Sequence, residues 1–417
     1  MAIISISDSQ INSADQVLVA DASSKIPAKD GSQITILNAT NISAGTIATA
    51  RLDTGTTANK IVVLDGSGNL PVVDGSQLTG VVSATVSASD PTISTNPSGG
   101  VGTEWNNSTS GEMYICTDAT AGANVWTNVG PGTGDIVPWA LGGSTYGFSS
   151  GGYSPQNDVI DRFAFSSNTT ATDHGNLSVA RTYNAGSSSL TYGYTAGGGY
   201  PTHTNIIDKF AFSANVTGTD VGNLTGIASA AAGHSSETHG FASGGISTIA
   251  RVDKYSFTSD GNASSHGNLS VGRGYCAGHS SGTQGFTSGG GSHSNVIDKF
   301  NYSSNTTAAD HGDLAIGMAY AAGQSSATYG FCATGNYPGS NTINKFAFSS
   351  NTTATDWGDL TVSVYLRAGQ SGITHGLASG GNSNSNVIDK FSYASNAGST
   401  DHGDLSQGRE APAGQQV

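Results

Sequence analysis

The amino-acid sequence predicts an all-β protein. Of its 417 residues, 59 are glycine, and only 11% carry a charge. Glycine at this level is costly inside helices, whereas short strands joined by tight turns accommodate it. A four-residue motif also recurs six times in the last two thirds of the chain, with strand-length segments around each copy. These observations favour many short strands over a helical architecture.

The first 85 residues contain an internal repeat of their own. The segment "QVLVADASSKIPAKDGSQ" at 16–33 matches "KIVVLDGSGNLPVVDGSQ" at 60–77. These segments are short, rich in threonine and alanine, and poor in aromatic residues, so they cannot bury much core alone. We therefore expect residues 1–85 to be stabilised by other copies of the chain, as in an intertwined fibre.

Residues 86–135 are predicted to form a small β module followed by a linker. The stretch "GEMYICTDATAGANVWTNVG" is typical of a hairpin that buries Tyr114 and Trp126, and "PGTGDIVP" is typical of a linker. Trp105 and Trp126 have two interpretations. They form either part of the module core, which we favour, or a stacking platform for a sugar.

Residues 136–417 are organised by the recurring motif. Its six copies begin at Ile160, Ile207, Val252, Ile297, Ile343 and Ile388; three read Ile-Asp-Lys-Phe and the other three differ from it at one or two residues. Successive starts are therefore 47, 45, 45, 46 and 45 residues apart. Each unit contains four strand-length segments, exemplified by "YGFSSGG", "NVIDKFAF", "TATDHGNLS" and "RTYNAGSSS". Four strands per unit of this length is typical of a propeller blade, so the spacing predicts a six-bladed β-propeller.

The glycine pairs that end the second strand of most units resemble the kelch blade signature. They are Gly151-Gly152, Gly197-Gly198, Gly244-Gly245, Gly289-Gly290 and Gly380-Gly381. In kelch blades the fourth strand usually carries a tryptophan. Here that position holds His174, Val221, His266, His311, Trp357 and His402, so the chain departs from the pattern in five units. The resemblance implies a kelch-like propeller.

The first unit lacks its own first strand, and the C-terminal segment "GREAPAGQQV" at 408–417 resembles a first strand without a unit. Pairing the two would remove the open sheet edges. A rival is "PWALGGSTYG" at 138–147, which also resembles a first strand. We favour the C-terminal segment.

The charged residues of the motif lie on opposite faces of their strand, because neighbouring side chains alternate. One hypothesis is a ring of ion pairs in which the aspartate of one blade meets the lysine of the next. The alternative is that both lie near the strand end in solvent. Asn344 replaces the aspartate in the fifth unit, which a strict charge ring would not tolerate well.

Several chemical functions are disfavoured. The net charge of −14 argues against a nucleic-acid partner and against an anionic membrane surface. Cys116, Cys276 and Cys332 fit no metal spacing and are predicted to be buried free thiols. The histidines of the fourth strands lie in different blades, so they do not form a metal site. We find no catalytic motif and expect neither a catalytic residue, a cofactor nor a bound metal.

The connections between the glycine pairs and the motif vary from unit to unit, and variable loops on a constant scaffold commonly carry recognition. Aromatic and histidine side chains there could stack on sugars while asparagine and serine bond the hydroxyl groups. The candidate receptor-binding residues are Tyr153, Tyr200, His203, His293 and Tyr337. For any one of them, an ordinary polar loop remains the alternative.

The phrases "ISAGTIATARL", "LDGSGNLP" and "DGSQLTGV", within roughly residues 15–82, resemble bacteriophage tail fibre proteins. The resemblance implies a homotrimeric virion protein assembled in the host cytoplasm. Residues 1–85 would attach to other tail or baseplate proteins, and 136–417 would meet a host-surface polysaccharide. We expect adhesion without enzymatic activity or membrane insertion. A glycan depolymerase, which needs clustered carboxylates, and a purely structural spike are the alternatives.

Overall fold

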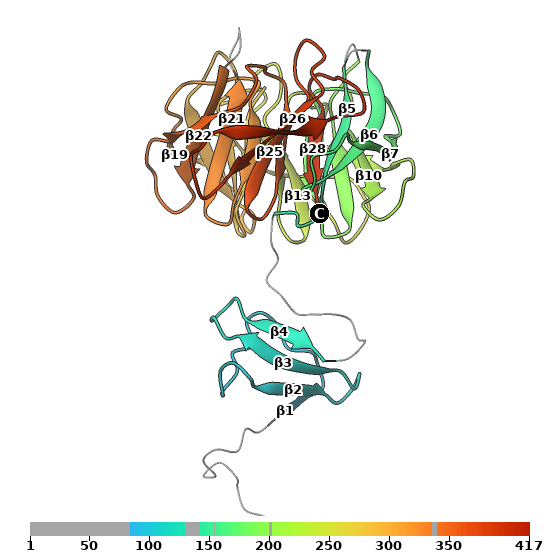
Figure 1. Cartoon of the computed structure of the whole chain (residues 1–417), viewed down its shortest axis with the longest axis vertical. Helices are drawn as coiled ribbons and strands as arrows, with labels where there is room; N and C mark the ends of the chain where they lie inside the picture. Colours follow the sequence, from blue (N-terminus) through green and yellow to red (C-terminus); the bar gives the residue numbers. More distant parts are fainter. Residues whose placement is uncertain (1–83, 130–141, 154, 200–201, 336–339) are drawn as a thin grey trace, which may run out of the picture. The chain divides into compact units, whose positions relative to one another are not determined.

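The computed structural model describes residues 84–129, 142–153, 155–199, 202–335 and 340–417. Every regular element in these ranges is a β-strand, which confirms the all-β prediction. Within the same ranges, no helix is long and apolar enough to cross a membrane. The strands form seven four-stranded sheets, one in residues 84–129 and six in residues 142–417 (Figure 1).

The small module is a sheet in the order β1-β2-β3-β4. Its strands are β1 (Thr85–Ser87), β2 (Glu104–Asn107), β3 (Met113–Asp118) and β4 (Val125–Asn128). Tyr114, Cys116 and Trp126 are fully buried, as expected for the hairpin interior. The ring of Trp105 meets that of Trp126 edge-on, with 5.7 Å between centroids. Because Trp126 has no exposed surface, the two do not form a joint sugar platform, and the core interpretation is confirmed.

The six sheets of residues 142–417 each have one strand from every predicted segment type, and we number them in chain order of their second strands. Sheet 1 contains β28 (Ala413–Gln416), β5 (Tyr146–Gly152), β6 (Asn157–Ala164) and β7 (Thr172–Asn176). Sheet 2 contains β8 (Ala185–Ser188), β9 (Tyr192–Ala196), β10 (Ile206–Ala211) and β11 (Thr219–Asn223). Sheet 3 contains β12 (Ala232–Ser235), β13 (His239–Ser243), β14 (Arg251–Ser256) and β15 (Ser264–Asn268).

The other three sheets follow the same order of strands. Sheet 4 contains β16 (Ala277–Ser280), β17 (Gln284–Ser288), β18 (Val296–Asn301) and β19 (Ala309–Asp313). Sheet 5 contains β20 (Ala322–Ser325), β21 (Tyr329–Gly335), β22 (Ser340–Ala347) and β23 (Thr355–Asp359). Sheet 6 contains β24 (Ala368–Ser371), β25 (His375–Ser379), β26 (Val387–Ser392) and β27 (Ser399–Asp404). All neighbouring strands in the six sheets pair antiparallel.

The C-terminal strand β28 pairs antiparallel with β5, in register from Ala413 opposite Ser150 to Gln416 opposite Gly147. This confirms that the last residues of the chain complete the first sheet. The described part of the rival segment does not take that place, because Gly143 instead bridges Gly372 of sheet 6.

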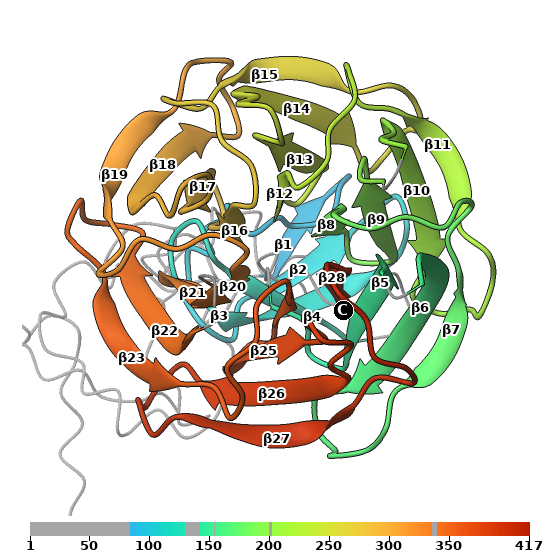
Figure 2. The same ribbon diagram turned by 90° about the horizontal axis from the view of Figure 1, so that it is seen from above.

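The six sheets stand around a common centre, with the first strands innermost and the fourth strands outermost (Figure 2). The first strands contact one another in the order β8, β12, β16, β20, β24 and β28, and β28 contacts β8. Glycine is required on these strands, because a Cβ on Gly233 would lie 2.0 Å from the carbonyl oxygen of Gly186. This part of the chain is therefore propeller-like.

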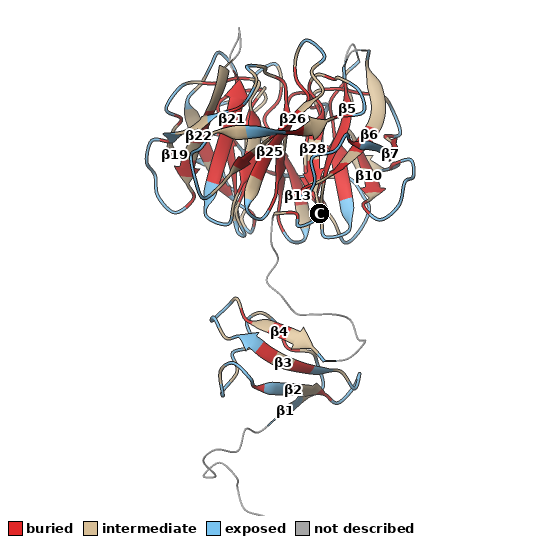
Figure 3. Cartoon of the chain, viewed as in Figure 1, coloured by how far each residue is buried: buried red, intermediate tan, exposed pale blue. Residues whose placement is uncertain are grey.

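The hydrophobic core lies between neighbouring sheets rather than at one centre (Figure 3). In sheet 1, the buried ring of Phe148 stacks on Phe212 of sheet 2, with 4.7 Å between centroids. The same stacking recurs in the pairs Tyr194–Phe257, Phe241–Tyr302, Phe286–Phe348 and Phe331–Tyr393. Between sheets 6 and 1, Leu377 and Phe165 share one cluster. The aromatic residue that follows the third strand of each sheet therefore joins that sheet to the preceding one.

A cycle of hydrogen bonds, which we call the serine ring, links the C-terminal ends of the six first strands. Its members are Ser188, Ser235, Ser280, Ser325, Ser371 and Gln416. Each backbone N–H donates to the side-chain oxygen of the next member, from 2.9 Å for Ser188 to 3.4 Å for Ser371. The N–H of Gln416 donates to Ser188 Oγ at 3.0 Å and completes the cycle.

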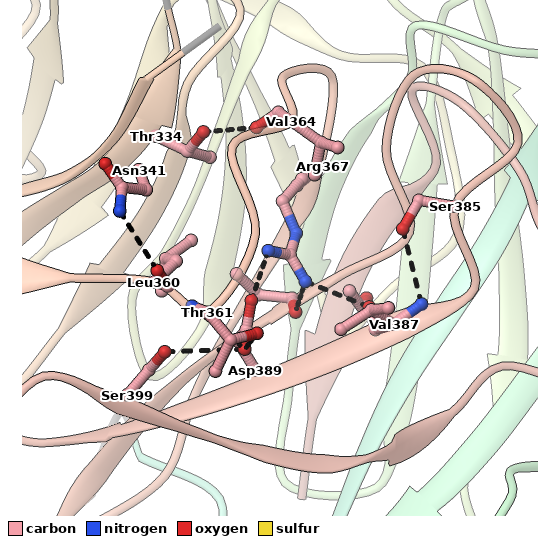
Figure 4. Close-up of polar contacts among 12 residues, drawn as sticks. Thr334, Asn341, Leu360, Thr361, Val364, Arg367, Ser385, Val387, Asp389 and Ser399 are labelled. Atoms are coloured by element: carbon pink, nitrogen blue, oxygen red, sulfur yellow. Dashed lines mark hydrogen bonds and ion pairs between the residues drawn. The ribbon is translucent and has the colours of Figure 1, made fainter.

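Neither hypothesis for the charged residues of the motif holds for the aspartates: no described motif aspartate pairs with a motif lysine, and these aspartates are buried rather than in solvent. The buried third-strand aspartates instead pair with arginines, in the pairs Asp161–Arg409, Asp208–Arg181, Asp253–Arg251, Asp298–Arg273 and Asp389–Arg367. In four sheets the arginine precedes the first strand of the same sheet, while Arg251 lies beside its aspartate on β14. Arg367 Nη1 donates to Asp389 Oδ2 at 2.6 Å, and Figure 4 shows the two side chains facing each other. Three of the lysines reach the next sheet: Lys209 pairs with Asp260, which lies outside the motif, at 2.6 Å, whereas Lys254 and Lys390 donate to the carbonyls of Tyr302 and Phe165.

The fourth-strand histidines pack against the neighbouring sheet. His174 Nε2 lies 2.9 Å from the carbonyl oxygen of Ala211 in the next sheet, and His266, His311 and His402 make the same contact in theirs. At the equivalent position, Trp357 Nε1 donates to the carbonyl of Ser392 at 2.9 Å. Imidazole and indole therefore make the same link between sheets, which supports the packing interpretation.

Candidate functional site

The connections of each sheet divide between its two ends. In four antiparallel strands, the second strand ends where the third begins, and the fourth strand ends where the first began. The variable connections from second to third strands therefore lie at the same end as the segments that precede the first strands. We call this end the loop face. The serine ring lies toward the opposite end, where the first strands finish.

Residues 142–417 begin and end away from the loop face. The backbone N–H of Thr145 donates to the carbonyl of Val417 at 2.8 Å, and the N–H of Gly143 donates to that of Ser371 at the same distance. Ser371 belongs to the serine ring. Gly143 and Val417 therefore lie at the same end of the six sheets, opposite the loop face.

Three of the five predicted receptor-binding residues are described, and all three lie on the loop face. Tyr153 is 40% exposed and its backbone pairs with Glu410 of the C-terminal segment. His203 is half-buried, and His293 is exposed on a turn with a φ of 62°. They come from sheets 1, 2 and 4 respectively, so they do not form one compact site. Tyr200 and Tyr337 lie outside the described residues.

A second cycle of hydrogen bonds surrounds the centre of the loop face, and we call it the mouth ring. Its members are Tyr183, Ala230, Tyr275, Tyr320, Leu366 and Ala411. Each backbone N–H donates to the carbonyl of the preceding member at 2.8–3.0 Å, and Tyr183 donates to Ala411. All six have positive φ, from 49° to 64°. Non-glycine residues rarely adopt this conformation, and here the ring of backbone hydrogen bonds holds it in place.

Four aromatic rings gather on the mouth ring, and we call them the tyrosine arc. Centroid distances are 5.8 Å for Tyr183–Tyr275, 4.4 Å for Tyr275–Tyr320 and 5.7 Å for Tyr320–Tyr365. All four side chains are half-buried. The hydroxyl groups of Tyr183, Tyr275 and Tyr320 make no hydrogen bond to any described residue, whereas the buried Tyr255 hydroxyl bonds Ser187.

The arc borders an open pocket at the centre of the loop face, lined also by Leu366, Arg367 and Pro412. Its volume is about 70 Å³, whereas one water needs about 10–15 Å³. Burial, and then the neighbouring tyrosines and Glu410, raise the pKa of Tyr183 to about 12. Burial also raises the pKa of Tyr275. Both phenols are therefore neutral near pH 7, and they can donate as well as accept hydrogen bonds.

Among the described residues of the loop face, every arginine is ion-paired and no lysine is present. After residue 142 the lysines are confined to the third-strand motif. The arginines near the loop face are the five ion-paired ones, and burial lowers the pKa of Arg409 although the Asp161 charge opposes that effect. The remaining charged groups at this end are carboxylates, including Asp158, Asp359 and Glu410. An acidic ligand would therefore meet no counter-charge here.

The described residues contain no group of three or more histidine, cysteine or carboxylate side chains that could hold a metal ion. Cys116, Cys276 and Cys332 are buried free thiols, as predicted. Burial raises the pKa of the Cys276 and Cys332 thiols to about 12. These thiols remain protonated at neutral pH, which makes them poor nucleophiles.

The tyrosine arc was not among the site residues expected from the sequence. Tyr183, Tyr275 and Tyr320 occupy the same position of the repeat, two residues before the first strand. Aligning the six units at that position shows three tyrosines beside alanine and leucine. The recurrence of tyrosine at this position is visible in the sequence. What the sequence does not show is the positive-φ turn that brings these residues of different sheets together around one centre.

No family model matches this chain, and no curated protein matches it.

Proposed function

We propose that the six sheets form a closed, six-bladed, kelch-like β-propeller. The contact of β28 with β8 supports closure, because it joins the last first strand to the first one. The two hydrogen-bond cycles support it independently, since each passes once through all six sheets. The glycine pairs and the indole of Trp357 support the kelch-like character.

We propose further that the protein is a bacteriophage tail fibre component that adheres to a host-surface polysaccharide. The observation that carries this proposal is the polarity of residues 142–417. Gly143 and Val417 lie at one end, and the variable loops and the tyrosine arc lie at the other. A domain at the tip of a fibre needs this arrangement, because the end that joins the fibre must be opposite the end that binds the host surface. The resemblance of residues 15–82 to tail fibres supplies the viral context.

In this proposal, residues 1–85 join the protein to other tail or baseplate proteins, in a homotrimer that is part of the virion. Adhesion occurs without catalysis, nucleic acid or membrane insertion. The described residues of the variable loops, Tyr153, His203 and His293, contribute to the recognising face. Tyr200 and Tyr337 belong to the same loops by sequence.

The test uses fluorescently labelled full-length protein and a panel of bacterial strains. The expected result is binding to at least one strain that is competed by polysaccharide extracted from it and abolished by mild periodate oxidation of the cells. Binding to no strain, or binding that is insensitive to both treatments, would overturn glycan adhesion in favour of a structural spike. New reducing ends released from the extracted polysaccharide would show a depolymerase instead.

The virion assignment has its own test. Cross-linking followed by mass spectrometry of intact particles is expected to join residues 1–85 to tail or baseplate proteins. Cross-links from those residues only to non-virion proteins would contradict it.

A further inference from the structure

We infer that the tyrosine arc at the centre of the loop face is a subsite for one uncharged pyranose unit. The inference rests on the proposed glycan adhesion and assigns the central position to residues that the variable-loop hypothesis did not include. It combines the shape of the arc, the unused hydroxyl groups and the charge of the surroundings.

The arc is a pre-organised aromatic platform. Its members Tyr183, Tyr275 and Tyr320 sit on a backbone fixed by the mouth ring, so little conformational entropy remains to be lost on binding. Tyrosine also loses few rotamers when a ligand docks on it. The C–H groups on one face of a pyranose are apolar enough to stack on such rings.

The polar groups of the arc suit sugar hydroxyls. Three phenol hydroxyls make no hydrogen bond to described residues, and neutral phenols both donate and accept. The pocket is open and has a volume of about 70 Å³, so part of a sugar unit can enter it while the rest of the unit lies outside. A hydroxylated ring placed here would keep its hydrogen bonds while covering the aromatic faces.

The charge of the face selects against acidic sugars. Each arginine near the mouth is committed to a buried aspartate, as Arg367 is to Asp389 at 2.6 Å. The remaining charged groups are carboxylates such as Glu410. A uronate or sulfated sugar would therefore meet repulsion without compensation.

A quaternary ammonium group is the competing occupant, because aromatic cages bind such cations. The geometry disfavours it. The Tyr275 and Tyr320 centroids are only 4.4 Å apart, so the two rings contact each other and leave no space between their faces for a cation. The arc is an open platform rather than a cage.

The first experiment measures saturation-transfer NMR with the full-length protein and small probes. The probes are the methyl pyranosides of glucose, galactose and mannose, the corresponding uronides, and tetramethylammonium. We expect transfer to at least one neutral pyranoside, with a Kd on the order of 1 mM for so few heavy atoms. The absence of transfer to every neutral pyranoside, a preference for uronides, or displacement by tetramethylammonium would each overturn the inference.

The second experiment locates the site. In the double variant Tyr275→Leu and Tyr320→Leu, leucine is the residue that sheet 6 carries at this position as Leu366, so the mouth ring is retained. We expect the neutral pyranoside to bind at least about tenfold more weakly, a loss of about 1.4 kcal/mol. The control is Tyr192→Ala, a tyrosine 36% exposed at the opposite end, which should bind normally. A second variant, Tyr320→Phe, keeps the ring and should lose less affinity.

The two proposals fail separately. Periodate-sensitive cell binding that survives the double leucine variant would overturn the subsite and leave glycan adhesion intact. Pyranoside binding at the arc without any cell binding would leave the subsite intact and overturn adhesion. The thermal unfolding midpoint of each variant shows that a loss of binding is not a loss of fold.

Discussion

The mouth ring and the serine ring link the same six sheets in different ways. The mouth ring uses backbone N–H and C=O groups only, and its side chains are three tyrosines, two alanines and a leucine. The serine ring uses side-chain oxygens as acceptors, and its members are five serines and Gln416. In the mouth ring the side chains can vary, because only backbone groups form the hydrogen bonds between sheets. In the serine ring the side chains are constrained, because each one accepts a hydrogen bond from the neighbouring sheet. The difference explains how the loop face can change its chemistry without loss of the fold.

The strongest way to break both rings is to delete residues 408–417. The deletion removes Ala411 from the mouth ring, Gln416 from the serine ring and the partner strand of β5. We expect loss of cooperative unfolding, or a large drop of its midpoint, in calorimetry. The control is Gln416→Ser, which installs the residue of the other five sheets and should remain folded. An unchanged midpoint after the deletion would contradict closure by the C-terminal strand.

Removing one partner of a buried ion pair near the loop face should give the next largest loss of stability. In sheet 1, Arg409→Met leaves Asp161 buried without its partner, and burial already raises the pKa of that carboxyl. Breaking a buried pair in this way costs about 3–5 kcal/mol. Urea denaturation should show that loss for the single variant.

Sheet 5 provides the compensating variant. It carries Met318 and Asn344 at the equivalent positions, with Asn344 Nδ2 3.5 Å from Met318 Sδ. The double variant Arg409→Met and Asp161→Asn should therefore recover most of the lost stability, because it copies a pair that the fold already accommodates. A double variant no more stable than the single one would contradict this comparison.

Acid should lower the free energy of unfolding through His234 and His279, which directly precede the serine-ring residues of their strands. Burial lowers the pKa of His234 to about 4 and that of His279 to about 3. Between pH 6.5 and 4, the unfolded chain binds a proton at each histidine and the folded chain does not. Stability is therefore complete above pH 6.5 and falls with pH by about 1.4 kcal/mol per unit for each histidine.

Glutamine is the matched replacement, because Gln324, Gln370 and Gln415 occupy this position in other sheets. The variant His234→Gln and His279→Gln should flatten the fall of stability between pH 6.5 and 4, measured by urea denaturation at several pH values. The fourth-strand histidines, whose pKa burial also lowers, keep part of the dependence. An equal slope in both proteins would show that the inner histidines are not responsible.

Much of the fold followed from the sequence, because each segment keeps its role in every repeat. The period predicted the four segment types, and the fragment at 408–417 predicted the partner of β5. The arginine partners of the aspartates did not follow, because Arg181 and Asp208 lie on separate segments, and strand alternation offered only lysine or solvent as candidates. The joint change to Met318 and Asn344 in the fifth unit was the available clue.

The candidate site was less predictable. Sequence variation pointed to the loop face, and Tyr153, His203 and His293 lie there. The tyrosine arc depends on a left-handed backbone at a position where the sequence has tyrosine, alanine or leucine rather than glycine. Local preference does not predict that conformation, because hydrogen bonds from neighbouring sheets impose it.

The most direct test of the account compares two positions at opposite ends of β20, Tyr320 in the mouth ring and Ser325 in the serine ring. Thermal unfolding and binding to neutral pyranosides are measured for Tyr320→Leu and Ser325→Ala. Ser325→Ala leaves the buried N–H of Ser280 without its acceptor, so stability should fall by about 1–3 kcal/mol with binding retained. Tyr320→Leu should weaken pyranoside binding and lower stability by no more than about 0.5–1.5 kcal/mol, the typical contribution of an aromatic pair. The reverse pattern, with binding lost at Ser325 and stability lost at Tyr320, would contradict the separation of recognition from closure.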